Sequence, residues 1–343
     1  MARTSLCTLL VCLSLSGIYC FPEVIKIAVL IGPNEEIWEN MLLHAVDGIN
    51  VGKALLPESK LSLMVEHLQE DNSLDTYNKV CKLLENKVVA LIGPNLPGQD
   101  SLVSSISAAM HIPHFQTTWH HDLDVRPFSI GLSPSPAIVA EALKDFIVRK
   151  DWSFLVYIYE GNEALVRLQE LEKDAEVMNR TVIPFDISAD HDDDDDDDDG
   201  NGTHQEDVWE LIKETKHRNF IIDVEKNHIR DVLLKAKDVG LMTELHSYLV
   251  ASLDFHAVDT KGLSKEKSTI YSLSLVDDQS HGFDFTAALF ADAPEGLTRN
   301  SEQKETKLVL GYDAIGMLAK ALHKMWSDGE VFELDDISCD DSS

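Results

Sequence analysis

The feature that most constrains the fold is a regular alternation of short β-branched runs with longer amphipathic patterns. From residue 24, "VIKIAVLIG" predicts a strand, and "NEEIWENMLLHAVDGIN" predicts a helix with Ile37, Met41, Ala45 and Ile49 on one face. The pair recurs in "LSLMVEHL" with "SLDTYNKVCKLLEN", and in "VVALIG" with "GQDSLVSSISAAM", before a short strand "HFQT". Repeated strand–helix–strand units form parallel sheets covered by helices on both faces, so the chain is predicted to be α/β.

A second set of units begins after "RPFSIGLSPSP", whose prolines interrupt the pattern. It contains one long helix "EALVRLQELEKDAEV" and ends with the extended run "STIYSLSLV", before a final helix "LVLGYDAIGMLAKALHKMW". We therefore expect two doubly wound lobes: residues 21–135 and 277–343 form lobe 1, incomplete at its carboxyl end, and residues 136–276 form lobe 2. Two such lobes would frame an interlobe cleft at the carboxyl ends of the strands, where a small molecule can bind.

Residues 1–20, "MARTSLCTLLVCLSLSGIYC", combine one arginine, a short apolar stretch and small residues near the end. This is the pattern of a secretory signal peptide, and the sequence leaves its cleavage point open. The apolar stretch is too short to span a bilayer, and no later segment reaches about 18 apolar residues, so no membrane span is predicted. The chain is expected to enter the secretory pathway.

Secretion leaves Cys81 and Cys339 as the cysteines outside the targeting segment and its edge. An oxidising compartment favours a disulfide, and two isolated buried thiols are the alternative. Asn179 and Asn201 each begin an Asn-x-Thr sequon in a predicted loop of lobe 2, so both are candidate glycosylation sites.

The charge is strongly acidic: 60 Asp and Glu against 29 Lys and Arg give a net charge of −31. Such a chain repels nucleic acid and anionic lipid. The aspartate run 192–199 lies in a polar connection, residues 189–204, which we interpret as a loop insertion dispensable for folding. A weak calcium site is the other interpretation, but a uniform run supplies charge without the staggered ligand geometry that calcium requires.

Enzymatic chemistry is not indicated, because the chain has no G-x-S-x-G, Walker A, H-E-x-x-H or paired C-x-x-C motif. We therefore expect neither catalysis nor a cofactor. His111, His114, His120 and His121 are crowded in "HIPHFQTTWHHD", but no acid or cysteine stands at a zinc-ligand spacing, so no metal is expected. In "IGPNLPGQDS", Asp100 is expected to cap a helix, where it would compete with an anionic ligand.

Four segments carry a resemblance to a known family: "VVALIGPNLPGQDSLVSSISAAMHIPHFQTTW", "DWSFLVYIYEGNEALVRLQEL", "VLLKAKDVGLMTELHSYLVASLD" and "LVLGYDAIGMLAKAL". From about residue 24 to Cys339 the chain resembles the amino-terminal domain of kainate-type ionotropic glutamate receptors. The resemblance implies the clamshell fold of type I periplasmic binding proteins and a Cys81–Cys339 disulfide. It also implies an extracellular domain that pairs with other receptor subunits through both lobes, and so guides assembly and modulates a cation channel.

The family's glutamate-binding and pore domains have no counterpart in these 343 residues, so none of their residues is carried over. A clamshell sensor of a small solute and a secreted decoy subunit remain alternatives. For the dimer interface we single out Tyr77, because Leu74, Tyr77, Val80 or Cys81, and Leu84 follow helical spacing. Packing of Tyr77 in the core of lobe 1 is the alternative for that residue.

Overall fold

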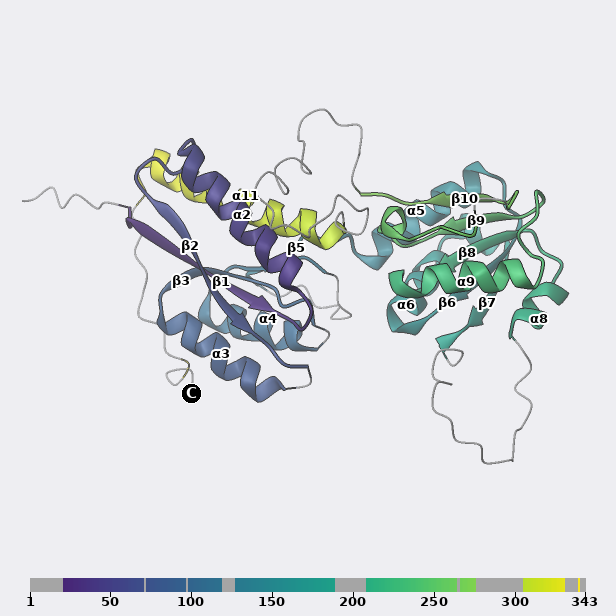
Figure 1. The fold of residues 1–343 in the computed structure, drawn as a ribbon, viewed down its shortest axis with the longest axis horizontal. Helices are drawn as coiled ribbons and strands as arrows, with labels where there is room; N and C mark the ends of the chain where they lie inside the picture. The colour runs from purple at the N-terminus through teal and green to yellow at the C-terminus, as the bar shows by residue number, and fades with distance from the viewer. Residues whose placement is uncertain are drawn as a thin grey trace, which may run out of the picture. The chain divides into compact units, whose positions relative to one another are not determined.

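A computed structural model describes residues 21–70, 72–96, 98–118, 127–188, 208–263, 266–275, 305–330 and residue 339. The chain forms two compact units (Figure 1). Lobe 1 comprises Met1–Thr117, Asp124–Ile130 and Gly311–Ser343, and lobe 2 comprises Thr118–Leu123 and Gly131–Leu310.

Lobe 1 contains a five-stranded sheet in the order β2-β1-β3-β4-β5. The pairs β1–β2, β1–β3 and β3–β4 are parallel. Its two central strands are apolar almost throughout and buried, as expected for a parallel sheet covered on both faces. The strands are β1 (Val24–Ile31), β2 (Lys60–His67), β3 (Val88–Ile92), β4 (His114–Gln116) and β5 (Ser129–Gly131).

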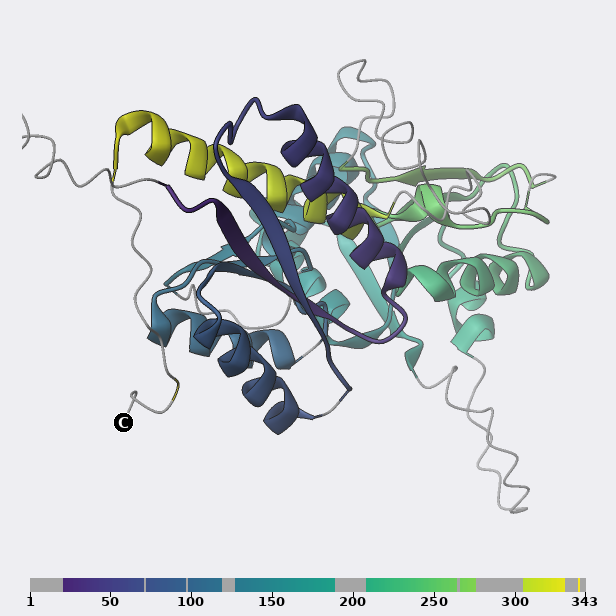
Figure 2. The same cartoon turned by 60° about the vertical axis from the view of Figure 1, so that its left-hand side comes forward.

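Two pairs of helices cover the sheet of lobe 1 (Figures 1 and 2). The helices α3 (Ser73–Glu85) and α4 (Gln99–Met110) pack on one face through Val80, Leu84 and Val103. The helices α2 (Glu36–Gly52) and α11 (Thr306–Asp328) cover the other face.

The predicted apolar face of α2 is partly wrong. Met41 and Ala45 are buried, but Ile37 is 47% exposed. The stripe that meets the sheet is instead centred one residue later, on Trp38, Met41 and Leu42, which are at most 1% exposed. Periodicity alone fits both stripes, and the larger tryptophan side chain takes the buried one.

Helix α11 begins in lobe 2 and continues into lobe 1, since the units divide between Leu310 and Gly311. Its first turn is capped by lobe 2: Asp254 Oδ1 accepts hydrogen bonds from the Thr306 backbone N–H and hydroxyl, both at 2.7 Å. Lys226 pairs with Glu305 directly before the helix. The expected crossover at residue 276 lies outside the described residues, whereas the first division, between Ile130 and Gly131, falls shortly before residue 135.

Lobe 2 contains a second five-stranded sheet, with all pairs parallel and the order β10-β9-β8-β6-β7. Its strands are β6 (Phe154–Tyr159), β7 (Thr181–Asp186), β8 (Asn219–Asp223), β9 (Ser247–Val250) and β10 (Thr269–Ser272). Its helices are α5 (Pro136–Arg149), α6 (Gly161–Glu172), α7 (Ala175–Met178), α8 (Val208–Glu214) and α9 (Lys226–Asp238).

Alternate side chains of β6 lie on opposite faces of this sheet. Val156 and Ile158 pack with α8 and α9, whereas Leu155 and Tyr157 pack with α5, α6 and α7. The α/β prediction for both lobes is therefore confirmed, and the fold is that of a two-lobed, periplasmic-binding-protein-like chain.

The long helix predicted from "EALVRLQELEKDAEV" is wrong in one respect, because the structure divides it into α6 and α7. Asp174 lies between them with extended backbone, and its carboxylate accepts a hydrogen bond from the Glu176 N–H at 2.8 Å. An aspartate can satisfy free backbone N–H groups in this way and begin a new helix. The acidic insertion, residues 189–204, lies outside the described residues.

Candidate functional site

Ligands of open α/β sheets bind at the carboxyl ends of the strands, which makes this edge of each sheet the candidate site. In lobe 1, polar groups after β1, β3 and β4 bind one another. Glu35 accepts hydrogen bonds from the Gly32 N–H at 2.9 Å and from Asn95 Nδ2 at 3.0 Å. The Thr117 hydroxyl donates to Asn95 Oδ1 at 2.6 Å. The edge thus carries a buried carboxylate in a hydrogen-bonded cluster, which opposes binding of an anion.

The amino-terminal turn of α4 lies at the same edge. Gly98 is its N-cap residue, so the expectation that Asp100 caps the helix is wrong. Asp100 stands inside the first turn, is 1% exposed, and accepts a hydrogen bond from Gln116 Nε2 at 3.3 Å. A carboxylate there is stabilised by the positive end of the helix dipole. The field that would attract an anionic ligand therefore already acts on Asp100.

The histidine-rich segment does not assemble a metal site among the described residues. His114 is buried, with Nε2 2.7 Å from the Gly93 carbonyl oxygen and Nδ1 3.0 Å from Ser104 Oγ. His111 ends α4 in a left-handed conformation with its ring against Phe128. Nowhere in the described chain do three His, Cys, Asp or Glu side chains converge as metal ligands would. His120 and His121 lie outside the described residues.

The carboxyl edge of lobe 2 holds a buried ionic cluster around Asp223, which is 1% exposed. Arg167 of α6 donates to both carboxylate oxygens, from Nε at 2.7 Å and from Nη2 at 2.6 Å. The Tyr157 hydroxyl donates to Asp223 Oδ2 at 2.5 Å. Burial and the neighbouring Asp223 carboxylate raise the pKa of Tyr157. Burial opposes the charge of Arg167, but the adjacent Asp223 raises the pKa of Arg167 overall, so the guanidinium stays charged.

A second hydrogen-bonded pair lies at the same edge. Glu160 follows β6, and its carboxylate oxygens lie 2.9 and 2.8 Å from Nδ1 of His228 on α9. Sequence reasoning missed both pairs. The available signal was an acid at or directly after a buried strand, as in "FLVYIYE" and "NFIID", but the sequence does not name the partner of either acid.

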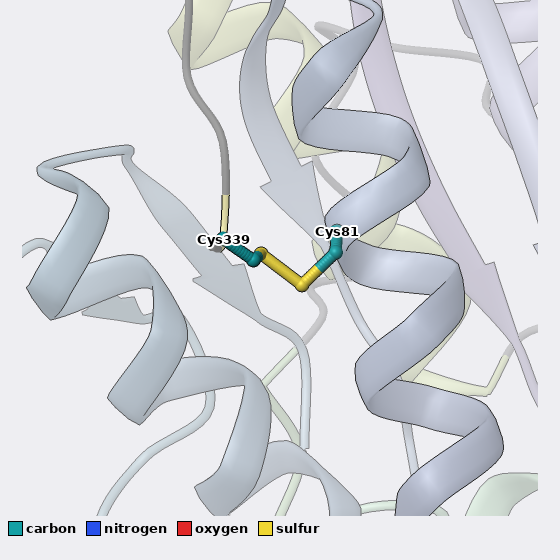
Figure 3. Close-up of a disulfide and its surroundings, with 2 residues drawn as sticks. All are labelled: Cys81 and Cys339. Carbon is teal, nitrogen blue, oxygen red and sulfur yellow. A yellow bond between two sulfur atoms is a disulfide. The ribbon is translucent and has the colours of Figure 1, made fainter. Parts of the chain in front are cut away.

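Helix α3 carries the residues for which roles in pairing and cross-linking were expected. Cys81 is joined to Cys339 across a sequence separation of 258, with a Cα–Cα distance of 5.7 Å (Figure 3). Both cysteines belong to the core cluster that includes Val80 and Leu84. The disulfide attaches a residue near the end of the chain to the middle of α3.

Tyr77 and Leu74 lie on the solvent side of α3, 37% and 71% exposed respectively. The expected single stripe is therefore divided, because Val80 and Leu84 are buried while these two residues are not. At a spacing of three, Leu74 and Tyr77 are neighbours on the helix surface. We call these two side chains the α3 surface.

The sequon at Asn179 is accessible. Asn179 ends α7, is exposed, and donates from Nδ2 to the Ala175 carbonyl oxygen at 3.1 Å. Asn201 lies outside the described residues. Of the helices that the structure describes, none is long and apolar enough to cross a membrane.

Comparison with known proteins decides the family. The family model described as "Receptor family ligand binding region" matches residues 37–342. The chain belongs to this family. Members are receptor ligand-binding regions and not a class of enzymes, which agrees with the absence of catalytic motifs from the sequence.

Curated relatives of this ligand-binding-region chain carry the name "Glutamate receptor ionotropic, kainate 1". The rat protein is 27% identical over 249 residues, which cover 69% of this chain and 25% of the relative. The human protein is 25% identical over 318 residues, which cover 88% of this chain and 33% of the relative. The chain thus spans about a quarter to a third of these relatives, and the predicted resemblance to their amino-terminal region is confirmed.

Proposed function

We propose that this ligand-binding-region chain is an extracellular module through which kainate-type glutamate receptor subunits assemble, and through which a ligand-gated cation channel is modulated. The observation that carries the proposal is the α3 surface, where Tyr77 and Leu74 project from a helix fixed by the Cys81–Cys339 disulfide. Its partners are other receptor subunits, bound through lobe 1 and through lobe 2.

The α3 surface has the composition of an interface centre with a polar rim. Tyrosine supplies a large, rigid contact area with a polar tip, and it is enriched among residues that dominate binding energy. Ion pairs lie beside it: Lys79 with Asp75 at 2.6 Å, and Lys82 with Glu66 at 2.7 Å. Apolar centres with charged rims are typical of specific protein interfaces.

The helix that carries this surface is held in place before any partner binds. Its N-cap residue Asn72 accepts a hydrogen bond from the Asp75 N–H at 3.1 Å. Near the helix middle, Cys81 is bonded to Cys339, and the flanking Val80 is buried. A surface that is already ordered loses less conformational entropy on association.

An extracellular location is part of the proposal. The cross-link between Cys81 and Cys339 is the chemistry of an oxidising compartment, and residues 1–20 have the pattern of a signal peptide. We also propose that exposed Asn179 carries a glycan. Solute sensing is less favoured, since the carboxyl edge of lobe 1 presents Glu35 and Asp100 where an anionic ligand would bind.

The test substitutes Tyr77→Asp in the secreted chain and measures dimerisation by analytical ultracentrifugation. Ile37→Asp is the matched control, because Ile37 is an exposed apolar residue on α2, which covers the opposite face of the same sheet. Loss of an interface anchor worth about 2 kcal/mol raises the dimer Kd about thirtyfold. The control should leave the Kd within about twofold, as surface changes away from an interface do.

Circular dichroism separates an interface effect from misfolding, since half-exposed Tyr77 can be replaced without opening the core. An unchanged dimer in Tyr77→Asp, or equal losses in both variants, would remove the α3 surface from assembly. Thermal stabilisation by free amino acids, with no dimer at any concentration, would instead favour the solute-sensor function.

A further inference from the structure

The amino edge of the lobe 2 sheet brings together side chains that neither the core nor the proposed assembly role uses. In register, Val156 pairs with Phe220, and Asn219 pairs with Ser247. Arg218 directly precedes β8. By the same register, it lies between Phe154 of β6 and His246, which directly precedes β9. Backbone bonds continue the ladder there, since the Ser247 N–H donates to the Arg218 carbonyl oxygen at 2.8 Å.

These side chains share one face of the sheet. Side chains alternate along strands, so Phe154, Arg218 and His246 lie on the face of Val156, Phe220 and Tyr248, which α8 and α9 cover further along. Neighbouring strands are about 4.8 Å apart, so the three positions span about 10 Å. The His217 ring stacks on Phe154, with ring centroids 5.7 Å apart and planes within 5°. We call Phe154, Lys216, His217, Arg218 and His246 the amino-edge row.

The row is basic in a strongly acidic chain. Lys216 and Arg218 are exposed, and neither forms an ion pair with any residue that the structure describes. Arg218 lies close enough to His246 that, after burial, its charge is the second cause of the lowered pKa of that histidine. Two acids close in sequence pair elsewhere, Glu244 with Lys267 at 3.9 Å and Asp151 with Arg180 at 3.6 Å, whereas exposed Glu214 ends α8 two residues before Lys216.

Helix dipoles do not account for these cations. Carboxyl ends of helices attract positive charge, and Lys213 in the last turn of α8 fits that explanation. Arg218, by contrast, directly precedes β8 and follows the helix by four residues.

The row combines charge with an accessible aromatic surface. Phe154 is 54% exposed, an unusual position for phenylalanine, and Arg218 is the residue opposite it in the sheet register. Guanidinium groups bind sulfate and phosphate oxygens through paired hydrogen bonds, and an aromatic ring can cover the apolar CH face of a sugar.

We propose that the amino-edge row binds an acidic sugar of a sulfated polysaccharide, with Lys216 and Arg218 holding sulfate groups and Phe154 packing against a pyranose ring. A thin linear chain can reach the row without facing the rest of the acidic surface, whereas a broad anionic surface cannot. A net charge of −31 repels a membrane or acidic protein that must approach over a wide area. Screening beyond about 8 Å lets a narrow chain interact with the row alone.

The experiment titrates the secreted chain with a heparin-derived hexasaccharide by isothermal calorimetry at physiological salt. Arg218→Glu should lower the affinity at least about tenfold, because it removes a charge-assisted bond and adds repulsion. Lys324→Glu is the matched control: it makes the same charge change at a 77% exposed lysine on α11 of lobe 1. Equal losses in both variants would show that net charge alone matters, which overturns the proposal.

Three further readouts identify the ligand class. Phe154→Ala should weaken hexasaccharide binding while leaving inorganic sulfate binding unchanged, and an unaffected hexasaccharide affinity overturns the sugar assignment. In NMR titration, bound hexasaccharide should raise the pKa of His246, because sulfate charge offsets that of Arg218. Binding to phosphatidylserine vesicles without binding to the hexasaccharide would replace the proposal with a membrane site. Circular dichroism of each variant excludes misfolding, since the Arg218 side chain is exposed.

Discussion

The contact of α11 with α2 gives a sharp test of how lobe 1 is packed. Gly311 lies where a Cβ atom would meet Trp38 Nε1 at 2.6 Å and Met41 Cε at 2.9 Å. Five residues further along the same helix, a Cβ on Gly316 would meet nothing within 4 Å. Gly311→Ala and Gly316→Ala are therefore the same chemical change at a tight and an open site.

The magnitude follows from separating helix propensity from packing. Each substitution gains about 1 kcal/mol of helix propensity, which cancels when the two variants are compared. Only Gly311→Ala adds an overpacking cost, about 1 to 3 kcal/mol for an extra methyl group in a filled core. The indole of Trp38 cannot retreat easily, because its other side lies against Gly93, whose own added Cβ would be 2.9 Å from the ring.

The assay is urea unfolding of the two variants and the parent, followed by far-ultraviolet circular dichroism. Gly316→Ala should be more stable than the parent, and Gly311→Ala should be less stable than Gly316→Ala by about 1 to 3 kcal/mol. Equal stabilities for the two variants would refute the close packing of α11 against Trp38. A Gly311→Ala variant that is more stable than Gly316→Ala would show that this part of α11 is not packed on α2 at all.

Two further predictions concern the buried Arg167–Asp223 ion pair and the Cys81–Cys339 disulfide. Asp223→Asn should lower the free energy of unfolding by about 3 to 5 kcal/mol, because it leaves the buried Arg167 guanidinium without its charge partner. Glu163→Gln, which removes the half-exposed partner of the same arginine, should cost less than about 1 kcal/mol, and equal urea midpoints for the two would contradict this account. Removing the Cys81–Cys339 disulfide by Cys81→Ser with Cys339→Ser should cost about 5 kcal/mol on the chain-entropy model. Thiol labelling of either cysteine in the folded, unreduced parent would show that the disulfide does not form.

The class of fold was predictable because strand and helix periodicities differ and are local. Buried runs such as "VVALI" and amphipathic patterns such as that of α9 identify their elements from residues that are close in sequence. Parallel sheets then follow from the alternation of the elements, since each crossover helix returns the chain to the same edge. The shortest elements were the least visible: the three residues of β5 are too few to show a period.

The sequence alone also established the acidic charge and the Asn-x-Thr sequons, and it predicts a signal peptide in residues 1–20, because each of these depends on residue type or local order. Which stripe of a helix is buried was decided only by tertiary packing. Both Ile37 and Trp38 fit a helical repeat on α2, and the neighbours in space selected Trp38. Pairing across long separations was likewise undetermined: Arg167 meets Asp223 across 56 residues, and Asn95 meets Glu35 across 60. A charged or polar residue carries no mark of its partner, and only the register of the sheet and the placement of its helices bring the two together.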